Sequence, residues 1–351
     1  MAGVNSSWRA RPVDCNPRCR YGATGGDVQA GGDVGRGALY EAGFKPQFSG
    51  HETFPIRYGW LKKVFDEVSE RSDDPENKKV FLDDAAIAKF GVGKNMVTSM
   101  RYWALATRIV EDKSGGNFKG PYVITPFGRA LFSDDGWDPY LEEPASLWWL
   151  QWQMAASPRT TTTIYFVFNH FNASTFYREQ LAAELRRYCE TIGYTDIADV
   201  TLKRDADCFV RTYVTRGWEG EEDSLESLMA ELALVQPIGK RDGFLINRGP
   251  KPSLPNEIFL YGLIEFARSR PTSKSFNVET LAHEPGSPGR VFLLNEDALL
   301  ERLSIIEELS EGRIAWSETA GLRQILFRAD PNSIDLMKIV ASAYPRRRRA
   351  A

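Results

Sequence analysis

The sequence predicts a mainly α-helical fold with short β-hairpins, which places it in the α+β class. Apolar residues recur at three- and four-residue spacing in several segments, a pattern typical of helices with one buried face. Between residues 84 and 132, a short apolar helix, a glycine-framed turn, a longer helix and a glycine-rich hairpin follow one another, which is the order of a winged helix-turn-helix. A helix followed by a hairpin recurs with a weaker signal in the C-terminal half, so further winged-helix units are an open alternative there.

The length of 351 residues favours two or three domains rather than a single core. We expect a winged-helix DNA-binding domain at 45–138, a helical middle domain at 139–248 and a C-terminal helical or α+β domain at 249–345. A disordered leader is expected at 1–44, because this segment is rich in Gly, Arg and Asp and has little periodic apolar content.

Composition excludes several classes of protein. The formal net charge of −3 does not fit a wholly basic, histone-like binder, although it allows a local basic face. No apolar run reaches the roughly 20 residues of a membrane span, and the N-terminus lacks the apolar core of a secretory signal. We therefore expect a cytoplasmic protein with no membrane partner.

The four cysteines predict no metal centre. Cys15 and Cys19 form a C-x3-C pair in the leader, but no second pair stands at ligand spacing, which disfavours structural zinc. Cys189 and Cys208 lie in apolar-patterned segments, so we expect both to be buried free thiols.

The predicted winged helix can be followed element by element. Its first helix begins at about Arg57, and Asp83 or Asp84 is expected to cap the second, because a side-chain oxygen there accepts from the free amides of the first turn. The third helix begins at Lys94, and the hairpin KSGGNFKGPYVITP and a short helix, PFGRALF, follow it. The third helix and the residues just after it are expected to turn Met96, Met100, Trp103, Leu105, Ala106 and Ile109 inward.

The middle of the chain is unusually aromatic. LWWLQWQM (147–154) predicts a buried helix, and TTTIYFVFNHF (161–171) predicts a helix or strand at a packed junction. Aromatic density of this kind is more typical of a core or domain interface than of a cofactor site. Helices are expected next in FYREQLAAELRRYCE and DADCFVRTYVTR, and a helix with a hairpin in 224–249. The remainder is predicted to be mostly helical with short strands.

Several segments are specific enough to resemble a known family. They are FSGHETFPIRYGWLKK (48–63), GVGKNMVTSMRYWALATRIVE (91–111), VITPFGRALF, DADCFVRTY and ETAGLRQI. From about Phe48 to Ala329 the chain resembles the SspB family of bacterial Ssp DNA phosphorothioation systems, which act in DNA modification and defence. This family has long been catalogued as a domain of unknown function.

The resemblance implies a function that the residues alone do not. It implies a DNA-nicking protein that works with a cysteine desulfurase, an ATPase and a PAPS-reductase-like enzyme. Together these proteins replace a non-bridging oxygen of a DNA phosphate with sulfur.

Contact with double-stranded DNA is predicted at the start of the third helix. Backbone amides, the positive helix end, Lys94 and Asn95 coincide there, which suits a phosphate or a base edge. Asn pairs bidentately with adenine and Arg with guanine in the major groove. The alternative is that the winged helix packs against a partner protein. The full set of predicted DNA contacts is Arg57, Lys94, Asn95, Ser99, Arg101, Lys113, Asn117 and Lys119.

The catalytic residues are harder to predict, because the chain shows no familiar nuclease signature. His51 and Glu52 are the candidates, since an imidazole and a carboxylate stand together in a polar turn beside Arg57. The alternative is that they hydrogen-bond their loop onto the first helix. Asp205 and Asp207 are the second choice, but on a helix they point about 200° apart and cannot share one ion. Hydrolysis of a phosphodiester suggests a divalent metal, Mg²⁺ or Mn²⁺, and His170 and His283 are interpreted as ordinary histidines.

Three functions therefore stay open. The first is a DNA-binding protein that nicks DNA for sulfur incorporation, and the second is a non-catalytic DNA-binding adaptor of the modification complex. The missing nuclease signature favours the adaptor, whereas the family resemblance favours the nicking enzyme. A winged-helix transcriptional regulator is the third, but no effector pocket is identified in the sequence.

Overall fold

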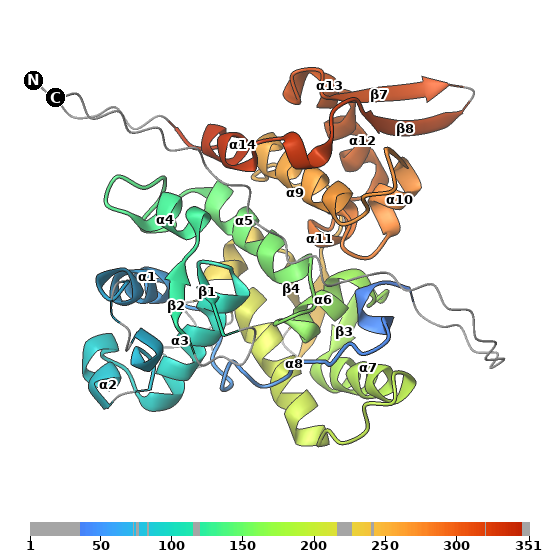
Figure 1. Cartoon of the computed structure of the whole chain (residues 1–351). Helices are drawn as coiled ribbons and strands as arrows, with labels where there is room; N and C mark the ends of the chain where they lie inside the picture. Colours follow the sequence, from blue (N-terminus) through green and yellow to red (C-terminus); the bar gives the residue numbers. More distant parts are fainter. Residues whose placement is uncertain are drawn as a thin grey trace, which may run out of the picture. The chain divides into compact units, whose positions relative to one another are not determined.

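The computed structural model describes residues 36–345, apart from 73, 75, 76, 83, 115–119, 216–226, 240, 241 and 320, and gives only the backbone of 78, 84 and 85. The described residues from Arg36 onward belong to one compact unit. The fold is mixed, with many helices and small antiparallel sheets (Figure 1). Among the described helices, none is long and apolar enough to span a membrane.

The N-terminal part follows the predicted order of elements. Helix α1 (Trp60–Glu70) buries one face, and α2 (Asp84–Phe90) leads through a turn into α3 (Lys94–Ala106). Gly91 permits this turn, because its φ of 67° lies in the left-handed region that disfavours side chains. Strands β1 (Val110–Asp112) and β2 (Tyr122–Ile124) then pair antiparallel.

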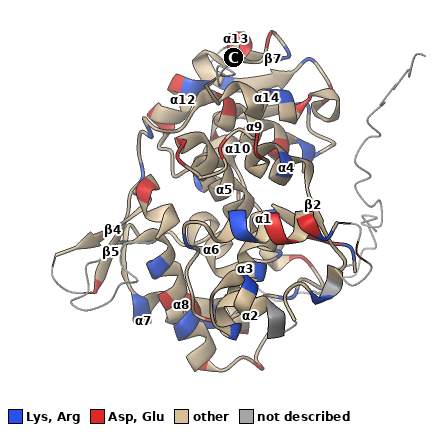
Figure 2. Cartoon of the chain, turned by 90° about the vertical axis from the view of Figure 1, so that its left-hand side faces the viewer, with Lys and Arg blue, Asp and Glu red and all other residues tan. Residues whose placement is uncertain are grey.

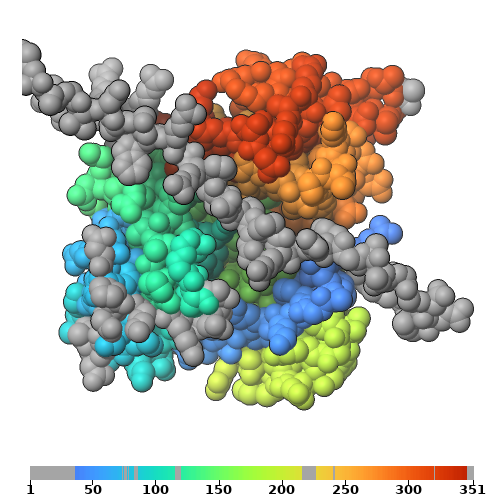
Figure 3. All heavy atoms as spheres, in the orientation of Figure 1, coloured from blue at the N-terminus to red at the C-terminus, as the bar shows by residue number. Residues whose placement is uncertain are grey.

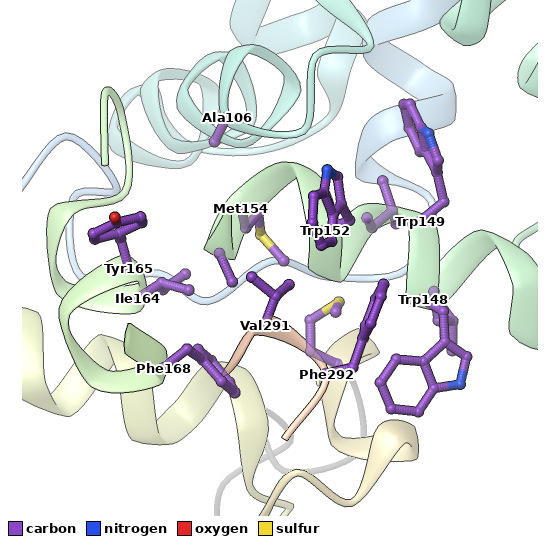
Figure 4. Packing of buried hydrophobic residues seen from close by; sticks show 14 of the residues in the cluster. Ala106, Trp148, Trp149, Trp152, Met154, Ile164, Tyr165, Phe168, Val291 and Phe292 are labelled. Carbon is purple, nitrogen blue, oxygen red and sulfur yellow. The ribbon is translucent and has the colours of Figure 1, made fainter. Parts of the chain in front are cut away.

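The core is centred on two consecutive helices after α4 (Pro126–Phe132). Every residue of α5 (Pro144–Ala155) after its first is buried, and every residue of α6 (Thr162–Asn169) is buried. A helix that is apolar all round must be covered on all sides, and Figure 4 shows Trp148 and Trp152 of α5 packed with Phe292. The prediction of a buried aromatic helix at 147–154 is confirmed.

The rest of the described chain repeats one topology twice. The first copy lies in the middle of the chain and consists of β3 (Thr175–Tyr177), α7 (Arg178–Thr191), α8 (Asp199–Tyr213), β4 (Val235–Ile238) and β5 (Gly243–Ile246). Its three strands form a sheet of order β3-β5-β4. Helix α9 (Asn256–Arg268) precedes the second copy, in which β6-β8-β7 is the sheet order. Its elements are β6 (Ser275–Asn277), α10 (Val278–His283), α12 (Glu296–Ser304), β7 (Ile314–Thr319) and β8 (Leu322–Phe327).

The two copies also share a sequence pattern. TFYREQLA (175–182) and SFNVETLA (275–282) each run from the first strand into the next helix. Phe176 and Phe276 are buried on the strands, and Leu181 and Leu281 on the helices. The remaining short elements are η1 (Ala38–Tyr40), η2 (Asn77–Lys79), η4 (Leu228–Leu232), α11 (Pro288–Val291), α13 (Ile306–Leu309), η5 (Pro331–Ser333) and α14 (Leu336–Ser342).

The expected leader is wrong in its last part. Leu39 is buried and its carbonyl accepts a hydrogen bond from the Tyr188 hydroxyl at 3.2 Å. Tyr40 packs edge-on against His170, and Figure 3 shows this first described segment lying against the residues of α7. Aromatic contacts therefore hold 36–44 in place, whereas residues 1–35 lie outside the described chain. The domain boundaries at 138 and 248 stay predictions, and one buried cluster includes residues on both sides of each.

Candidate functional site

The loop before α1 has a strained backbone. Ser49, Glu52 and Thr53 have φ values of 61°, 48° and 69°, in a region that residues other than glycine seldom occupy. Gly50 is pressed against α3, since a Cβ there would lie 2.6 Å from a ring carbon of Tyr102. Such a conformation persists only where surrounding contacts hold it.

A buried histidine–aspartate pair provides those contacts. His51 Nε2 lies 2.9 Å from Asp205 Oδ1 on α8, and both residues are 4% exposed. The same carboxylate accepts from the Ser49 amide at 2.7 Å and from the Thr163 hydroxyl of α6 at 2.7 Å. The Thr53 amide donates to His51 Nδ1 at 3.1 Å. One carboxylate thus joins the loop, α6 and α8.

The protonation of this pair follows from its partners. Burial lowers the pKa of His51, whereas Cys208 and the hydrogen bond with Asp205 raise it. Cys208 lies beside the pair, and its Sγ donates to the Phe54 carbonyl at 3.5 Å. The Thr53 amide also requires an acceptor at Nδ1. These contacts favour the neutral ring with its proton on Nε2, facing Asp205.

The start of α3 is exposed and rich in hydrogen-bond donors. Lys94 and Asn95 are exposed, and within the described chain Lys94 forms no ion pair. Gly93 occupies the N-cap without a side-chain hydrogen bond, which leaves backbone amides of the first turn free. An uncapped helix N-terminus beside a lysine is suited to an anion.

Arg101 lies farther along α3 and is half-buried. It is hydrogen-bonded to Tyr122 of β2, whose pKa is raised by burial and lowered again by the arginine. The guanidinium is thus held between α3 and the hairpin.

Comparison with known proteins gives the family. Residues 48–344 match the family described as "Protein of unknown function (DUF4007)". The chain belongs to this family. Two solved structures, "Magnesium ion-bound SspB crystal structure" and "SspB crystal structure", are similar, with TM-scores of 0.74 and 0.73. Each is 29% identical and covers 85% of this chain and 88% of its own. No curated protein matches, and the resemblance to SspB is confirmed.

The structure of this DUF4007 protein separates the two predicted catalytic residues. His51 faces a space of about 10 Å³, too small for a phosphodiester, whereas Glu52 is exposed. The alternative interpretation was that His51 and Glu52 hydrogen-bond their loop onto the first helix. The loop is instead hydrogen-bonded to Asp205 of α8, so that interpretation is wrong about the helix. For His51 to touch DNA, the loop would have to leave Asp205.

Several predicted DNA contacts change in the structure. Ser99 is wrong as a contact, because it is fully buried and its hydroxyl donates to the Phe54 carbonyl. Lys113 pairs with Glu111 at 2.7 Å on the exposed hairpin. Arg57 is half-buried, and its guanidinium lies 5.5 Å from the centre of the Trp60 ring. Asn117 and Lys119 lie outside the described residues.

The described residues do not offer a metal site of the expected kind. Among them, no group of three or more His, Cys, Asp or Glu side chains is placed to hold an ion. Both ring nitrogens of His51 are engaged by Asp205 and Thr53, which leaves none for coordination. The predicted Mg²⁺ or Mn²⁺ does not fit at His51 and Glu52.

Sequence reasoning missed the role of Asp205. It paired Asp205 with Asp207, but Asp207 is turned to Arg178 at 3.1 Å, as their opposite directions on α8 require. A usable signal was present, since Asp205 lies among the apolar residues of α8, and a buried carboxylate needs partners. Cys189 and Cys208 are buried free thiols, as predicted.

Proposed function

We propose that this DUF4007 protein binds double-stranded DNA in a phosphorothioation system and nicks it for sulfur incorporation. The similarity to SspB structures over 85% of the chain supports the pathway. The exposed and uncapped start of α3 is the observation that carries DNA binding. The cysteine desulfurase, the ATPase and the PAPS-reductase-like enzyme are proposed as partners on the family resemblance.

The DNA-binding element is proposed to be a winged helix-turn-helix formed by α1, α2, α3 and the β1–β2 hairpin. In this motif the second helix of the pair enters the major groove with its N-terminal residues. Lys94 and Asn95 stand at that position, and Arg101 is braced by the hairpin. In Figure 2 the ribbon of this part carries Lys and Arg positions in blue, interspersed with Asp and Glu positions in red.

A comparison of exposed charges at the start of α3 and of α12 supports the choice of α3. In the C-terminal copy, α12 begins with exposed Glu296 and Asp297, and Glu301 is exposed farther along. Such a helix repels phosphate. Because Lys94 at the start of α3 and the acidic residues at the start of α12 have opposite charges, we propose that α3 contacts DNA and that α12 faces proteins.

Charge reversal on α3 tests the DNA-binding proposal. Lys94→Glu and Arg101→Glu should each weaken binding of a 20-base-pair duplex and lower the dependence of log Kd on log salt by about 1 for each phosphate that the protein no longer neutralises. Lys274→Glu is the matched control, because Lys274 is exposed and lies in the C-terminal copy. Equal affinity of all four proteins in fluorescence anisotropy would contradict the assignment of α3.

A second candidate function is the non-catalytic adaptor. The burial of His51 and the lack of a three-residue ligand group among the described side chains favour it. Supercoiled plasmid incubated with the protein and Mg²⁺ or Mn²⁺ distinguishes the two. Open-circle product that EDTA abolishes supports the nicking enzyme, and its persistence in His51→Ala removes His51 from the mechanism. Plasmid that stays supercoiled supports the adaptor.

A further inference from the structure

Three basic side chains, one buried and two half-buried, lie close together where β5 ends. Arg248 and Lys251 follow the strand, and Arg290 of α11 lies close enough to Arg248 for their charges to interact. Lys251 is 5% exposed, and its Nζ donates to two backbone carbonyls, of Asn247 at 2.8 Å and of Gly249 at 3.3 Å. Arg248 Nη2 is buried and has no hydrogen-bond partner.

None of these three cations has a carboxylate partner among the described residues. Burial and, to a smaller extent, repulsion by Arg248 lower the pKa of Lys251 to about 8 and that of Arg290 to about 10. A buried charge is costly unless it is paired. Elsewhere the chain follows that rule, since Arg178 meets both Asp207 and Asp242. The cluster therefore lacks an anion.

A pocket opens beside Arg290. Its volume is about 520 Å³, within the range of sites for small ligands. Arg290 Nη2 donates to Asn172 Oδ1 at 2.9 Å and Nε to the His283 carbonyl at 3.2 Å, which fixes the guanidinium at the wall and leaves its other N–H groups free. The wall also includes Asn169, Asn172, His170 and His283.

His170 also lies at this wall. Its Nε2 is buried without a hydrogen-bond partner, and its ring packs against Tyr40 and Tyr165. Burial and the nearby Arg290 lower its pKa to about 4, so the ring is neutral at pH 7 and can carry its proton on Nε2. Glu279 and Glu284 also line the pocket, but neither forms an ion pair with Arg290 in the described structure.

We propose that this pocket binds a phosphate ester, held by the guanidinium of Arg290, with the charge of Arg248 nearby adding to the attraction. Phosphate oxygens accept from planar guanidinium groups in a bidentate manner. The ligand would supply the anion that the cluster lacks. The proposal does not depend on DNA binding at α3, because the phosphate belongs either to a free nucleotide or to a DNA backbone.

The test measures binding of inorganic phosphate and AMP by calorimetry, at ionic strength matched with NaCl. Wild-type protein should bind both, and Arg290→Met should weaken binding about ten- to a hundred-fold, the usual effect of losing a charged hydrogen bond. Arg248→Met removes only a nearby charge and should weaken binding less. Arg187→Met is the matched control, because Arg187 is exposed. If Arg290→Met does not fold, Arg290→Lys replaces it in the test, because lysine keeps the positive charge but lacks the planar guanidinium that donates two parallel hydrogen bonds.

A competing 12-base-pair duplex, added to the Lys94→Glu protein, identifies the source of the phosphate. Displacement of AMP by the duplex supports a DNA phosphate, and displacement by phosphate alone supports a free nucleotide. The proposal is overturned if wild-type protein binds neither AMP nor phosphate at millimolar concentration. It is also overturned if Arg290→Met and Arg248→Met bind as tightly as wild type.

Discussion

Removal of the Asp205 carboxylate should strongly destabilise the fold, because this side chain is a buried acceptor for three hydrogen bonds. Asp205→Ala leaves the Ser49 amide, the His51 imidazole and the Thr163 hydroxyl without their acceptor in a buried space. Hydrogen bonds to a charged group contribute roughly 1.5–3 kcal/mol each, but losses within one network are not additive. Breaking a buried charge network usually costs about 3–5 kcal/mol.

We therefore expect Asp205→Ala to lower the free energy of unfolding by roughly 3–5 kcal/mol, a large fraction of the 5–15 kcal/mol typical of a domain. Urea unfolding followed by tryptophan fluorescence measures it, and the chain has nine tryptophans, one of which, Trp103, stacks on His51. Asp207→Ala is the control two residues away, since Asp207 is 55% exposed and pairs with Arg178 at the surface. It should change stability by less than about 1 kcal/mol.

A loss below about 1 kcal/mol for Asp205→Ala would refute the structural role of the network. If the expected loss is observed, a double-mutant cycle with His51→Ala should show that the stability losses of the two single variants are less than additive in the double variant, because both variants release the same loop. Independent losses would mean that His51 and Asp205 act separately.

Three further predictions concern the pocket and the core. His170 has its pKa lowered from 6.5 to about 4 by burial and Arg290. Because the unfolded state binds the proton more readily, stability should be full above pH 6.5 and fall by up to about 3 kcal/mol as the pH drops toward 4; urea unfolding of wild type and His170→Gln at pH 7 and 5 should show a smaller drop in the variant. Arg248→Met should leave the Tm unchanged or raise it, because it removes an unpaired buried charge; calorimetry that shows a lower Tm would argue for an unseen partner. Gly262→Ala should cost roughly 1–3 kcal/mol, because its Cβ would lie 2.7 Å from the Trp152 ring; an unchanged urea midpoint would contradict this packing.

Local pattern was enough to predict most helices. The 3.6-residue periodicity of α1 and the largely apolar sequence of α5 are properties of single segments, so they are visible in the sequence. The β1–β2 hairpin followed from its glycine-rich turn. The ordering of residues 36–44 could not be predicted in this way, because Leu39 is fixed by Tyr188, 149 residues away.

The candidate sites were predicted only in part, for the same reason. Lys94 and Asn95 stand at a helix start, which the GVG turn makes visible in the sequence. The burial of Ser99 and the pairing of His51 with Asp205 depend on α3 and α8 meeting the loop, and no spacing in the sequence encodes that meeting. His170 and Arg290 likewise come together at one pocket from positions 120 residues apart.

Function cannot be inferred from topology alone, because the middle and C-terminal copies share one topology but differ in surface charge. The middle and C-terminal copies share sheet order, and both carry the F-x4-LA pattern, yet their exposed charges differ. On α8, Lys203 and Arg204 are exposed, whereas α12 presents Glu296 and Asp297. Because phosphate attracts the first set and repels the second, surface charge would favour different partners for the two copies. If a charge-reversed α12, with Glu296→Lys and Asp297→Lys, gained DNA affinity while Lys94→Glu lost it, surface charge rather than topology would be shown to decide which unit binds DNA.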